Sequence, residues 1–256
     1  MTRFLLLLTL IGLTAGAASA ATMSSITVPV VIRGRTQVVH LYGHRGAPPV
    51  VVSSGDGGWI HLGPHLAETL AAHGFFVVGF NVKAYLESFT TERSTLTADD
   101  VRGDFRSLVN FAAAGATERP ILVGVSEGAG LSVLAATNPG LQPQIAGVVG
   151  LGLPDINELA WRWTDSVIFV THGIPNEPTF SVGDLIAKAA PVPIAAVHSD
   201  RDEFVPLREI ERLMAAAHEP KRLWIVNASD HRFSNNTGEC DRRLLDAIDW
   251  IHAQVH

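Results

Sequence analysis

The sequence has very little cysteine: Cys240 is the one thiol among 256 residues. A single thiol cannot form an intramolecular disulfide, so the folded chain must be stabilised by its core. We expect no catalytic role for Cys240, because its surroundings, TGECDRR, show no activating arrangement.

Charge is also sparse, and no basic stripe is present. Charged residues make up 17% of the chain, the formal net charge is −6, and acidic and basic residues are interspersed. Nothing in this pattern would follow a phosphate backbone, so we expect no nucleic-acid partner. Hydrophobic residues reach 47%, which is enough for a full core. The length fits one α/β domain or two small ones, and we interpret the chain as a single domain.

Residues 1–20 carry the layout of a secretory signal. Arg3 precedes an apolar block from Phe4 to Leu13, and the segment ends in Ala18-Ser19-Ala20. The block is short for a membrane span, and the small-residue ending is typical of a cleavage site. We therefore predict cleavage near Ala20, a mature domain over residues 21–256, and export from the cytoplasm; an uncleaved membrane anchor is the alternative.

Apolar, β-branched segments recur along the chain and predict strands. They cover residues 26–32, 36–42, 49–54, 75–82, 120–126, 145–151, 192–198 and 221–228. Helical patterns fall between them, at residues 64–74, 97–115, 205–218 and 240–255, and a further apolar segment follows residue 126. The alternation predicts an α/β fold with a mostly parallel sheet of about eight strands and helices on both faces. Residues 153–190 break the alternation, and we expect an inserted hairpin and loop there that packs or shapes a pocket.

The motif GVSEGAG, residues 124–130, lies between an apolar strand and an apolar helix. Gly124 and Gly128 flank Ser126 at positions where side chains would collide in a tight turn. The context favours Ser126 as a nucleophile on a strand-to-helix turn, and the alternative is a serine in a plain glycine-rich bend. A serine hydroxyl needs a base and a group that orients the base.

Candidates for these partners follow two later strands. Asp202 lies in SDRDEFVP after one strand, and His231 lies in SDHRFSNN after the next. The order serine, acid, histidine is the one that accompanies such a turn, and the ends of parallel strands meet at one edge of a sheet. We predict Asp202 as the acid, with Asp200 as its competitor, and His231 as the base.

The glycine-rich loop SSGDGGW, residues 53–59, is the candidate for the rest of the site. We expect the amides of Asp56 and Glu127 to hold an oxyanion. Candidate substrate contacts are Gly55, Gly57, Trp59 and Trp163. We expect no cofactor and no metal. His61 and His65 have a spacing that suits zinc, but Pro64 lies between them and no third ligand is evident.

Three sequence features together resemble the VirJ/AcvB family of exported bacterial proteins within the α/β-hydrolase superfamily. They are SGDGGW at residues 54–59, GFFVVGFNVKAYLESFTTE at residues 74–92, and the helix that leads to the strand-to-helix turn at Ser126, called the elbow below. The resemblance implies an α/β-hydrolase fold, a periplasmic or secreted location, a triad of Ser126, Asp202 and His231, and ties to virulence and type IV secretion. It also implies a substrate such as lysyl-phosphatidylglycerol. The family's elbow is closer to GYSFGAD, from which Glu127 and Gly130 depart.

The acidic residues near the elbow bear on the substrate. Asp56, Glu127 and Glu203 all fall in segments expected to converge on Ser126, where they would favour a cationic acyl group; solvated loop acids are the alternative. We therefore predict a serine esterase acting on a small-molecule or lipid ester, and the resemblance implies an aminoacyl-phosphatidylglycerol at a membrane surface as the candidate substrate. The alternatives are a general carboxylesterase or peptidase, and a non-catalytic secretion accessory protein.

Overall fold

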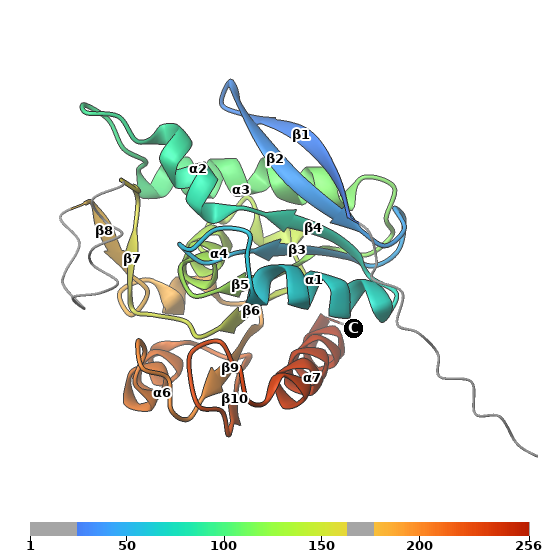
Figure 1. Ribbon diagram of the computed structural model, residues 1–256, viewed down its shortest axis with the longest axis vertical. Helices are drawn as coiled ribbons and strands as arrows, with labels where there is room; N and C mark the ends of the chain where they lie inside the picture. Colours follow the sequence, from blue (N-terminus) through green and yellow to red (C-terminus); the bar gives the residue numbers. More distant parts are fainter. Residues whose placement is uncertain (1–24, 163–176, 256) are drawn as a thin grey trace, which may run out of the picture.

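The computed structural model describes residues 25–162 and 177–255. Its centre is an eight-stranded sheet in the order β1-β2-β4-β3-β5-β6-β9-β10 (Figure 1). The strands are β1 (Ile26–Ile32), β2 (Arg35–Tyr42), β3 (Pro49–Ser53), β4 (Phe76–Phe80), β5 (Ile121–Val125), β6 (Gly147–Leu151), β9 (Ile194–Ser199) and β10 (Lys221–Val226). The β1–β2 and β2–β4 pairs are antiparallel, and the other neighbours are parallel. The predicted mostly parallel sheet is confirmed.

Helices cover both faces of this sheet. They are α1 (Leu62–Ala72), α2 (Val82–Phe89), α3 (Ala98–Ala113), α4 (Glu127–Ala136), α6 (Leu207–Ala216) and α7 (Thr237–Val255), with short 3₁₀ segments η1 (Gln142–Gln144) and η3 (Ile186–Ala189). α1 and α7 pack on one face, whereas α3, α4 and α6 pack on the other. Strand side chains alternate between the two: Val51 faces α3 and α4, and Val50 and Val52 face α1.

Local signals explain where two of the helices begin. α3 opens with a capping box in which Thr97 and Asp100 bond each other's backbone N–H groups, and it continues through Gly103. α2 is a helix that the sequence analysis missed, because the predicted strand ran to residue 82. Asn81 instead caps α2 by accepting a hydrogen bond from the N–H of Ala84. The strand therefore ends at Phe80.

The insertion holds a hairpin with a sheet of its own. β7 (Ile156–Glu158) pairs antiparallel with β8 (Thr179–Ser181). Leu159 and Trp161, which follow β7, are buried and belong to the same core cluster as α3 and α4. Trp163 lies outside the described residues. The described part of the insertion thus packs on the core.

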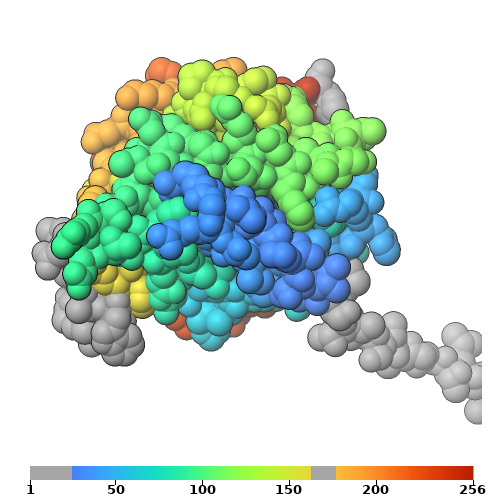
Figure 2. All heavy atoms as spheres, turned by 90° about the horizontal axis from the view of Figure 1, so that it is seen from above, coloured from blue at the N-terminus to red at the C-terminus, as the bar shows by residue number. Residues whose placement is uncertain are grey.

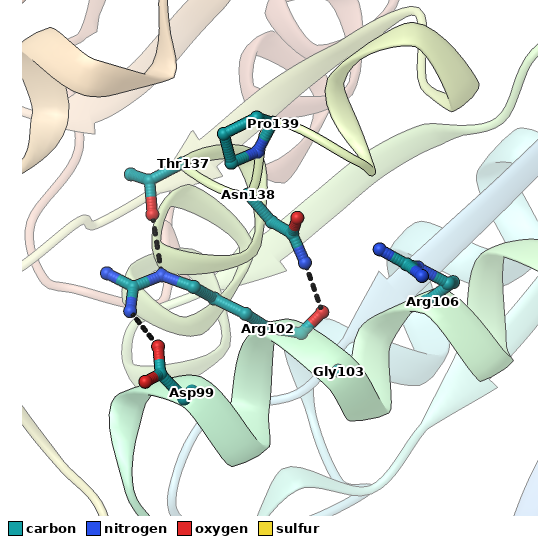
Figure 3. A pocket seen from close by; sticks show the side chains of 7 residues that line it. All are labelled: Asp99, Arg102, Gly103, Arg106, Thr137, Asn138 and Pro139. Atoms are coloured by element: carbon teal, nitrogen blue, oxygen red, sulfur yellow. Dashed lines mark hydrogen bonds and ion pairs between the residues drawn. The ribbon is translucent and has the colours of Figure 1, made fainter.

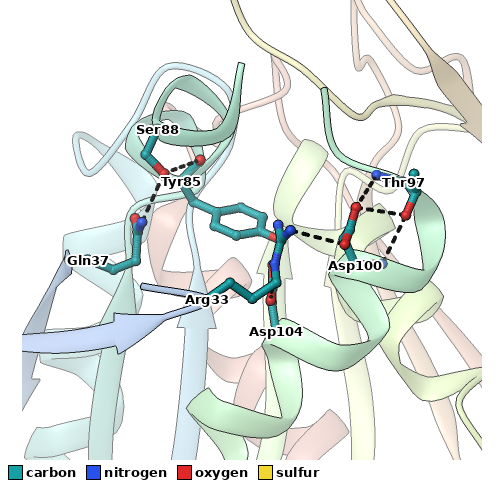
Figure 4. A network of polar contacts seen from close by, with 7 residues as sticks. All are labelled: Arg33, Gln37, Tyr85, Ser88, Thr97, Asp100 and Asp104. Carbon is teal, nitrogen blue, oxygen red and sulfur yellow. Dashed lines mark hydrogen bonds and ion pairs between the residues drawn. The ribbon is translucent and has the colours of Figure 1, made fainter. Parts of the chain in front are cut away.

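A polar network ties the β1–β2 hairpin to α2 and α3 (Figure 4). Asp104 on α3 is 2% exposed; it accepts hydrogen bonds from Nε of Arg33 at 2.8 Å and from the hydroxyl of Tyr85 on α2 at 2.6 Å. Arg33 sits at the hairpin turn, where its φ is 45°. In the view from above, the hairpin lies directly against the green surface that α2 and α3 form (Figure 2). Because the buried carboxylate has charged and neutral donors, it stabilises this junction.

Candidate active site

Ser126 occupies a sharp turn between β5 and α4. Its φ is 51° and its ψ is −120°, and its side chain is half-buried. A positive φ is costly for a residue with a Cβ, so the surrounding contacts must hold it. Such a turn exposes the serine oxygen at the edge of the sheet, which is the geometry of a nucleophile elbow.

The two flanking glycines are required by close backbone approaches. A Cβ on Gly124 would lie 2.3 Å from the carbonyl oxygen of Gly128, and a Cβ on Gly128 would lie 2.4 Å from the carbonyl oxygens of Ser53 and Ser54. No side chain fits at these distances, so α4 approaches β5 and the end of β3 closely only because both residues are glycine. The roles inferred for Gly124 and Gly128 from the motif agree with these contacts.

The acid and the histidine meet at the ends of β9 and β10. Oδ2 of Asp202 lies 2.6 Å from Nδ1 of His231, and Oδ1 accepts the N–H groups of Phe204 and Val205 at 2.9 and 2.8 Å. Burial alone would raise the pKa of Asp202, but the hydrogen bond and charge of His231, with the two N–H donors, hold it below its ordinary value. The carboxylate is therefore ionised and orients the imidazole.

The competing acid has a different partner. Oδ1 of Asp200 accepts the N–H of Ala228 at 3.0 Å, which ties the loop after β9 to the loop after β10. Asp230, beside the histidine, accepts the N–H groups of Arg232 and Ser234 within its own turn. Among these three acids, Asp202 is the one that bonds the imidazole of His231 in the part of the chain that the structure describes.

Gly152 brings His231 to the elbow. A Cβ on Gly152 would lie 2.5 Å from Cε1 of the imidazole, and its φ is 57°. The preceding residue, Leu151, accepts the N–H of Ser126 at 2.9 Å. The imidazole therefore lies over the stretch of chain that hydrogen-bonds the serine backbone. Sequence reasoning missed Gly152, whose signal is a glycine directly after a buried strand.

The glycine-rich loop packs against the serine. A Cβ on Gly55 would lie 3.4 Å from Cβ of Ser126, which places the neighbouring Asp56 amide beside the elbow. The Glu127 amide is the first of α4, where the first N–H groups have no partner within the helix. Both amides thus lie in the segments next to Ser126 where the sequence suggested them, and their role as oxyanion donors stays a prediction.

Trp59 is engaged by the fold itself. Its ring occupies the space above Gly79, where a Cβ would lie 2.3 Å from Cη2, and it stacks on His40 with ring centroids 5.0 Å apart. Gly57, two residues before it, is exposed. The indole therefore anchors the glycine-rich loop on β2 and β4, and its suggested contact with substrate stays a prediction.

Two carboxyl groups beside the serine have raised pKa values. Burial is the main cause for Asp56, whose pKa rises to about 6 although His231 and two backbone N–H groups partly oppose the rise. Burial also raises the pKa of Glu127 well above its ordinary value, and the charges of Asp56 and Glu158 add to it. Oε1 of Glu127 accepts the N–H of Glu158 at 2.8 Å. Glu127 is thus a buried acid bonded to the backbone of β7, and burial disfavours its charged form, whereas the sequence suggested a charged acid in a loop around Ser126.

Glu203, the third acid of that expectation, contacts the histidine. Its Oε2 accepts the backbone N–H of His231 at 2.8 Å. Burial disfavours the charged forms of Asp56 and Glu127, whereas Glu203 is exposed. The negative potential expected of three carboxylates is reduced accordingly.

A cavity of about 420 Å³ lies elsewhere, between α3 and the end of α4 (Figure 3). Its lining residues are Asp99, Arg102, Gly103, Arg106, Thr137, Asn138 and Pro139. Arg102 spans it, donating to Thr137 at 3.0 Å and to Asp99 at 2.7 Å. Thr137 follows α4 and Ser126 precedes it, so the helix length of about 15 Å separates this cavity from the serine.

One of the two histidines considered for zinc, His65, has another partner. Nε2 of His65 lies 2.8 Å from Oδ1 of Asp241, which links α1 to α7. Across residues 25–162 and 177–255, the structure groups no three side chains that suit a metal ion. In the same residues, no helix combines the length and apolar character needed to cross a membrane.

Comparison with known proteins gives the chain a family resemblance and a fold. Residues 49–153 match the family described as bacterial virulence protein (VirJ). The uncharacterized protein YfhR of Escherichia coli O157:H7 is 24% identical over 198 residues, 77% of this chain and 68% of that protein.

Solved structures agree on the architecture. The esterase domain of a Rhodothermus marinus protein superposes with a TM-score of 0.60 at 18% identity, over 91% of this chain and 98% of that one. A membrane phospholipase A described as a bacterial virulence factor gives 0.62 at 14% identity, over 90% and 87%. The chain therefore has the α/β-hydrolase fold, and the predicted resemblance to the VirJ family is confirmed over residues 49–153.

Proposed function

We propose that this protein is a serine hydrolase that cleaves an ester through an acyl-enzyme intermediate. One observation carries the proposal: a serine is held at φ 51° on a strand-to-helix turn and bonds Leu151, and the next residue, Gly152, contacts an imidazole whose Nδ1 lies 2.6 Å from a buried carboxylate. A structural serine gains nothing from this strain, whereas a nucleophile gains exposure. The strained Ser126 and the Asp202–His231 pair both lie at the edge of the sheet where the parallel strands end.

The reaction follows from the groups present. Oγ of Ser126 attacks the ester carbonyl while Nε2 of His231 takes its proton, and the amides of Asp56 and Glu127 bind the oxyanion. Collapse expels the alcohol, which receives that proton, and leaves the acyl group on Ser126. Water, deprotonated by the same imidazole, then releases the acid and restores the serine. Asp202 stabilises the imidazolium in both halves.

For the substrate we propose an aminoacyl-phosphatidylglycerol, with lysyl-phosphatidylglycerol as the first candidate. The VirJ match, the likeness to a membrane phospholipase A, and the acids Asp56 and Glu203 support this choice. A cationic acyl group would be attracted by the two acids, and Gly55, Gly57, Trp59 and Trp163 are the proposed substrate contacts. Export through residues 1–20 and work at a membrane surface in the periplasm, beside secretion-system partners, belong to the same proposal.

A fluorophosphonate that reacts with activated serines tests the reaction. The chain from Ala21 onward should be labelled, and a Ser126→Ala variant of equal melting temperature should not be. If a folded parent is not labelled, the elbow is not activated and a binding protein on the same fold replaces the hydrolase.

The substrate needs its own comparison. Unlabelled parent should release lysine from lysyl-phosphatidylglycerol with a higher kcat/KM than it shows for a neutral short-chain ester. Equal values for the lysyl and neutral esters would reject the aminoacyl-lipid choice and leave a general carboxylesterase. A peptidase would instead turn over an amide of the same acyl group.

A further inference from the structure

Three consecutive residues after β9 all contact His231. Asp202 binds its Nδ1 at 2.6 Å, Glu203 accepts its backbone N–H at 2.8 Å, and the Phe204 ring packs edge-on against its imidazole with centroids 5.5 Å apart. The first contact belongs to the triad described above. The other two have no part in the proposed proton transfers, so their effect must come through the position of the ring.

We propose that Glu203 is a positioning residue, which fixes the main chain of His231 so that the imidazole reaches both Asp202 and Ser126. The proposal rests on the proposed hydrolase function. A hydrogen bond at Nδ1 fixes one atom of the ring and leaves the ring free to swing about it. A second bond at the backbone N–H fixes the base of the same side chain.

The position of His231 in the fold explains why this bond is needed. The residue lies in the loop after β10, next to the outermost strand of the sheet, and the following Phe233 has a φ of 57°. His231 is only 9% exposed, so its N–H would otherwise be a poorly hydrated donor without a partner. Glu203 reaches it from the loop after the neighbouring parallel strand, β9, which joins the acid loop and the histidine loop at the main chain.

Two substitutions separate the hydrogen bond from the charge. Glu203→Gln keeps a side-chain oxygen that can accept the N–H and removes the charge, whereas Glu203→Ala removes both. With a neutral short-chain ester, Glu203→Ala should lower kcat by about 10- to 100-fold, because a small displacement of a catalytic group is costly. KM should stay within about twofold and Glu203→Gln should retain at least a third of the parental kcat, by the same reasoning.

A matched control is available on α6. Glu209 accepts the backbone N–H of Asp155 at 2.8 Å, a bond of the same kind and length that does not involve His231. Glu209→Ala should leave kcat and the rate of fluorophosphonate labelling at parental values, even where its melting temperature falls as far as that of Glu203→Ala. This comparison separates a positioning role from general loss of stability.

The outcomes are distinct. If the parent is labelled and Glu203→Ala matches it in kcat and labelling rate, the positioning role is wrong and the hydrolase stands. If Glu203→Gln is as slow as Glu203→Ala, the charge and not the hydrogen bond matters, and the proposal is overturned. If the folded parent is not labelled at all, both proposals fall together.

Discussion

The change Asp202→Asn tests how far the acid orients the histidine. The asparagine oxygen can keep accepting the N–H groups of Phe204 and Val205, so the loop after β9 should keep its shape. Its NH₂ group would then face Nδ1 of His231, where Oδ2 now lies at 2.6 Å. A donor there forces the imidazole to carry its proton on Nε2, which removes the base that Ser126 needs.

The size of the effect follows from comparable triads. The wrong tautomer lowers kcat by about 10⁴-fold, which corresponds to about 5 kcal/mol of lost transition-state stabilisation. Stopped-flow or steady-state hydrolysis of an activated ester measures it, with melting temperatures as a check on folding. Asp202→Asn also removes the negative charge that stabilises the imidazolium formed during the reaction, and this loss lowers kcat further.

Asp200→Asn is the matched control for this change. Asp200 lies two residues away and accepts the N–H of Ala228 at 3.0 Å, a bond that an asparagine oxygen can also accept. We expect its kcat to stay within about threefold of the parent, since surface substitutions that keep their contacts have small effects. Equal losses in Asp200→Asn and Asp202→Asn, or a full kcat in Asp202→Asn, would refute the assignment of the acid.

Two further predictions concern stability. Gly128→Ala places a Cβ 2.4 Å from the carbonyl oxygens of Ser53 and Ser54, so it should lower the free energy of unfolding in urea by about 3 kcal/mol. Gly103→Ala has open space around its Cβ and should raise this free energy by up to about 1 kcal/mol. Equal effects of the two substitutions would contradict the close contact at Gly128. The hydrogen bond to Asp241 raises the pKa of His65, so its contribution is complete below the ordinary pKa of histidine and is lost as the pH rises through the raised value. Because the pair is partly exposed, His65→Asn should cost about 0.5 kcal/mol at pH 5 and nothing at pH 9, and a cost that grows with pH would reject this linkage.

The parallel strands could be predicted because burial on both faces leaves a continuous apolar run. β3, β5 and β6 are buried at every residue, and each coincides with such a run. α2 could not be predicted in the same way, since the apolar segment before it continues to Val82 and only the cap at Asn81 marks the boundary. The strand that pairs with β7 could not be predicted from the sequence either, because a three-residue strand carries too short a pattern to specify a register.

The same distinction applies to the candidate site, of which one part could be predicted from the sequence and another could not. Chain order and strand ends were enough to suggest that Ser126, Asp202 and His231 converge, because parallel strands present their ends at one edge. Both Asp200 and Asp202 bond the loop after β10, and the choice between them depends on which carboxylate meets the imidazole of His231 and which meets the N–H of Ala228; that orientation has no local signal. Likewise, the burial of Glu127 depends on a contact with the N–H of Glu158, which is 31 residues away in sequence.

The two elbow residues that depart from the GYSFGAD pattern contact the same strand. Glu127 accepts the N–H of Glu158, and a Cβ on Gly130 would lie 1.9 Å from Oδ1 of Asn157, so no side chain fits there. An aspartate at position 130 would push β7 away from α4, and an apolar residue at position 127 would leave the Glu158 N–H without this acceptor. Each of the two residues therefore permits β7 to lie close to the first turn of α4, and changing either would move that strand away from the edge where Ser126 lies.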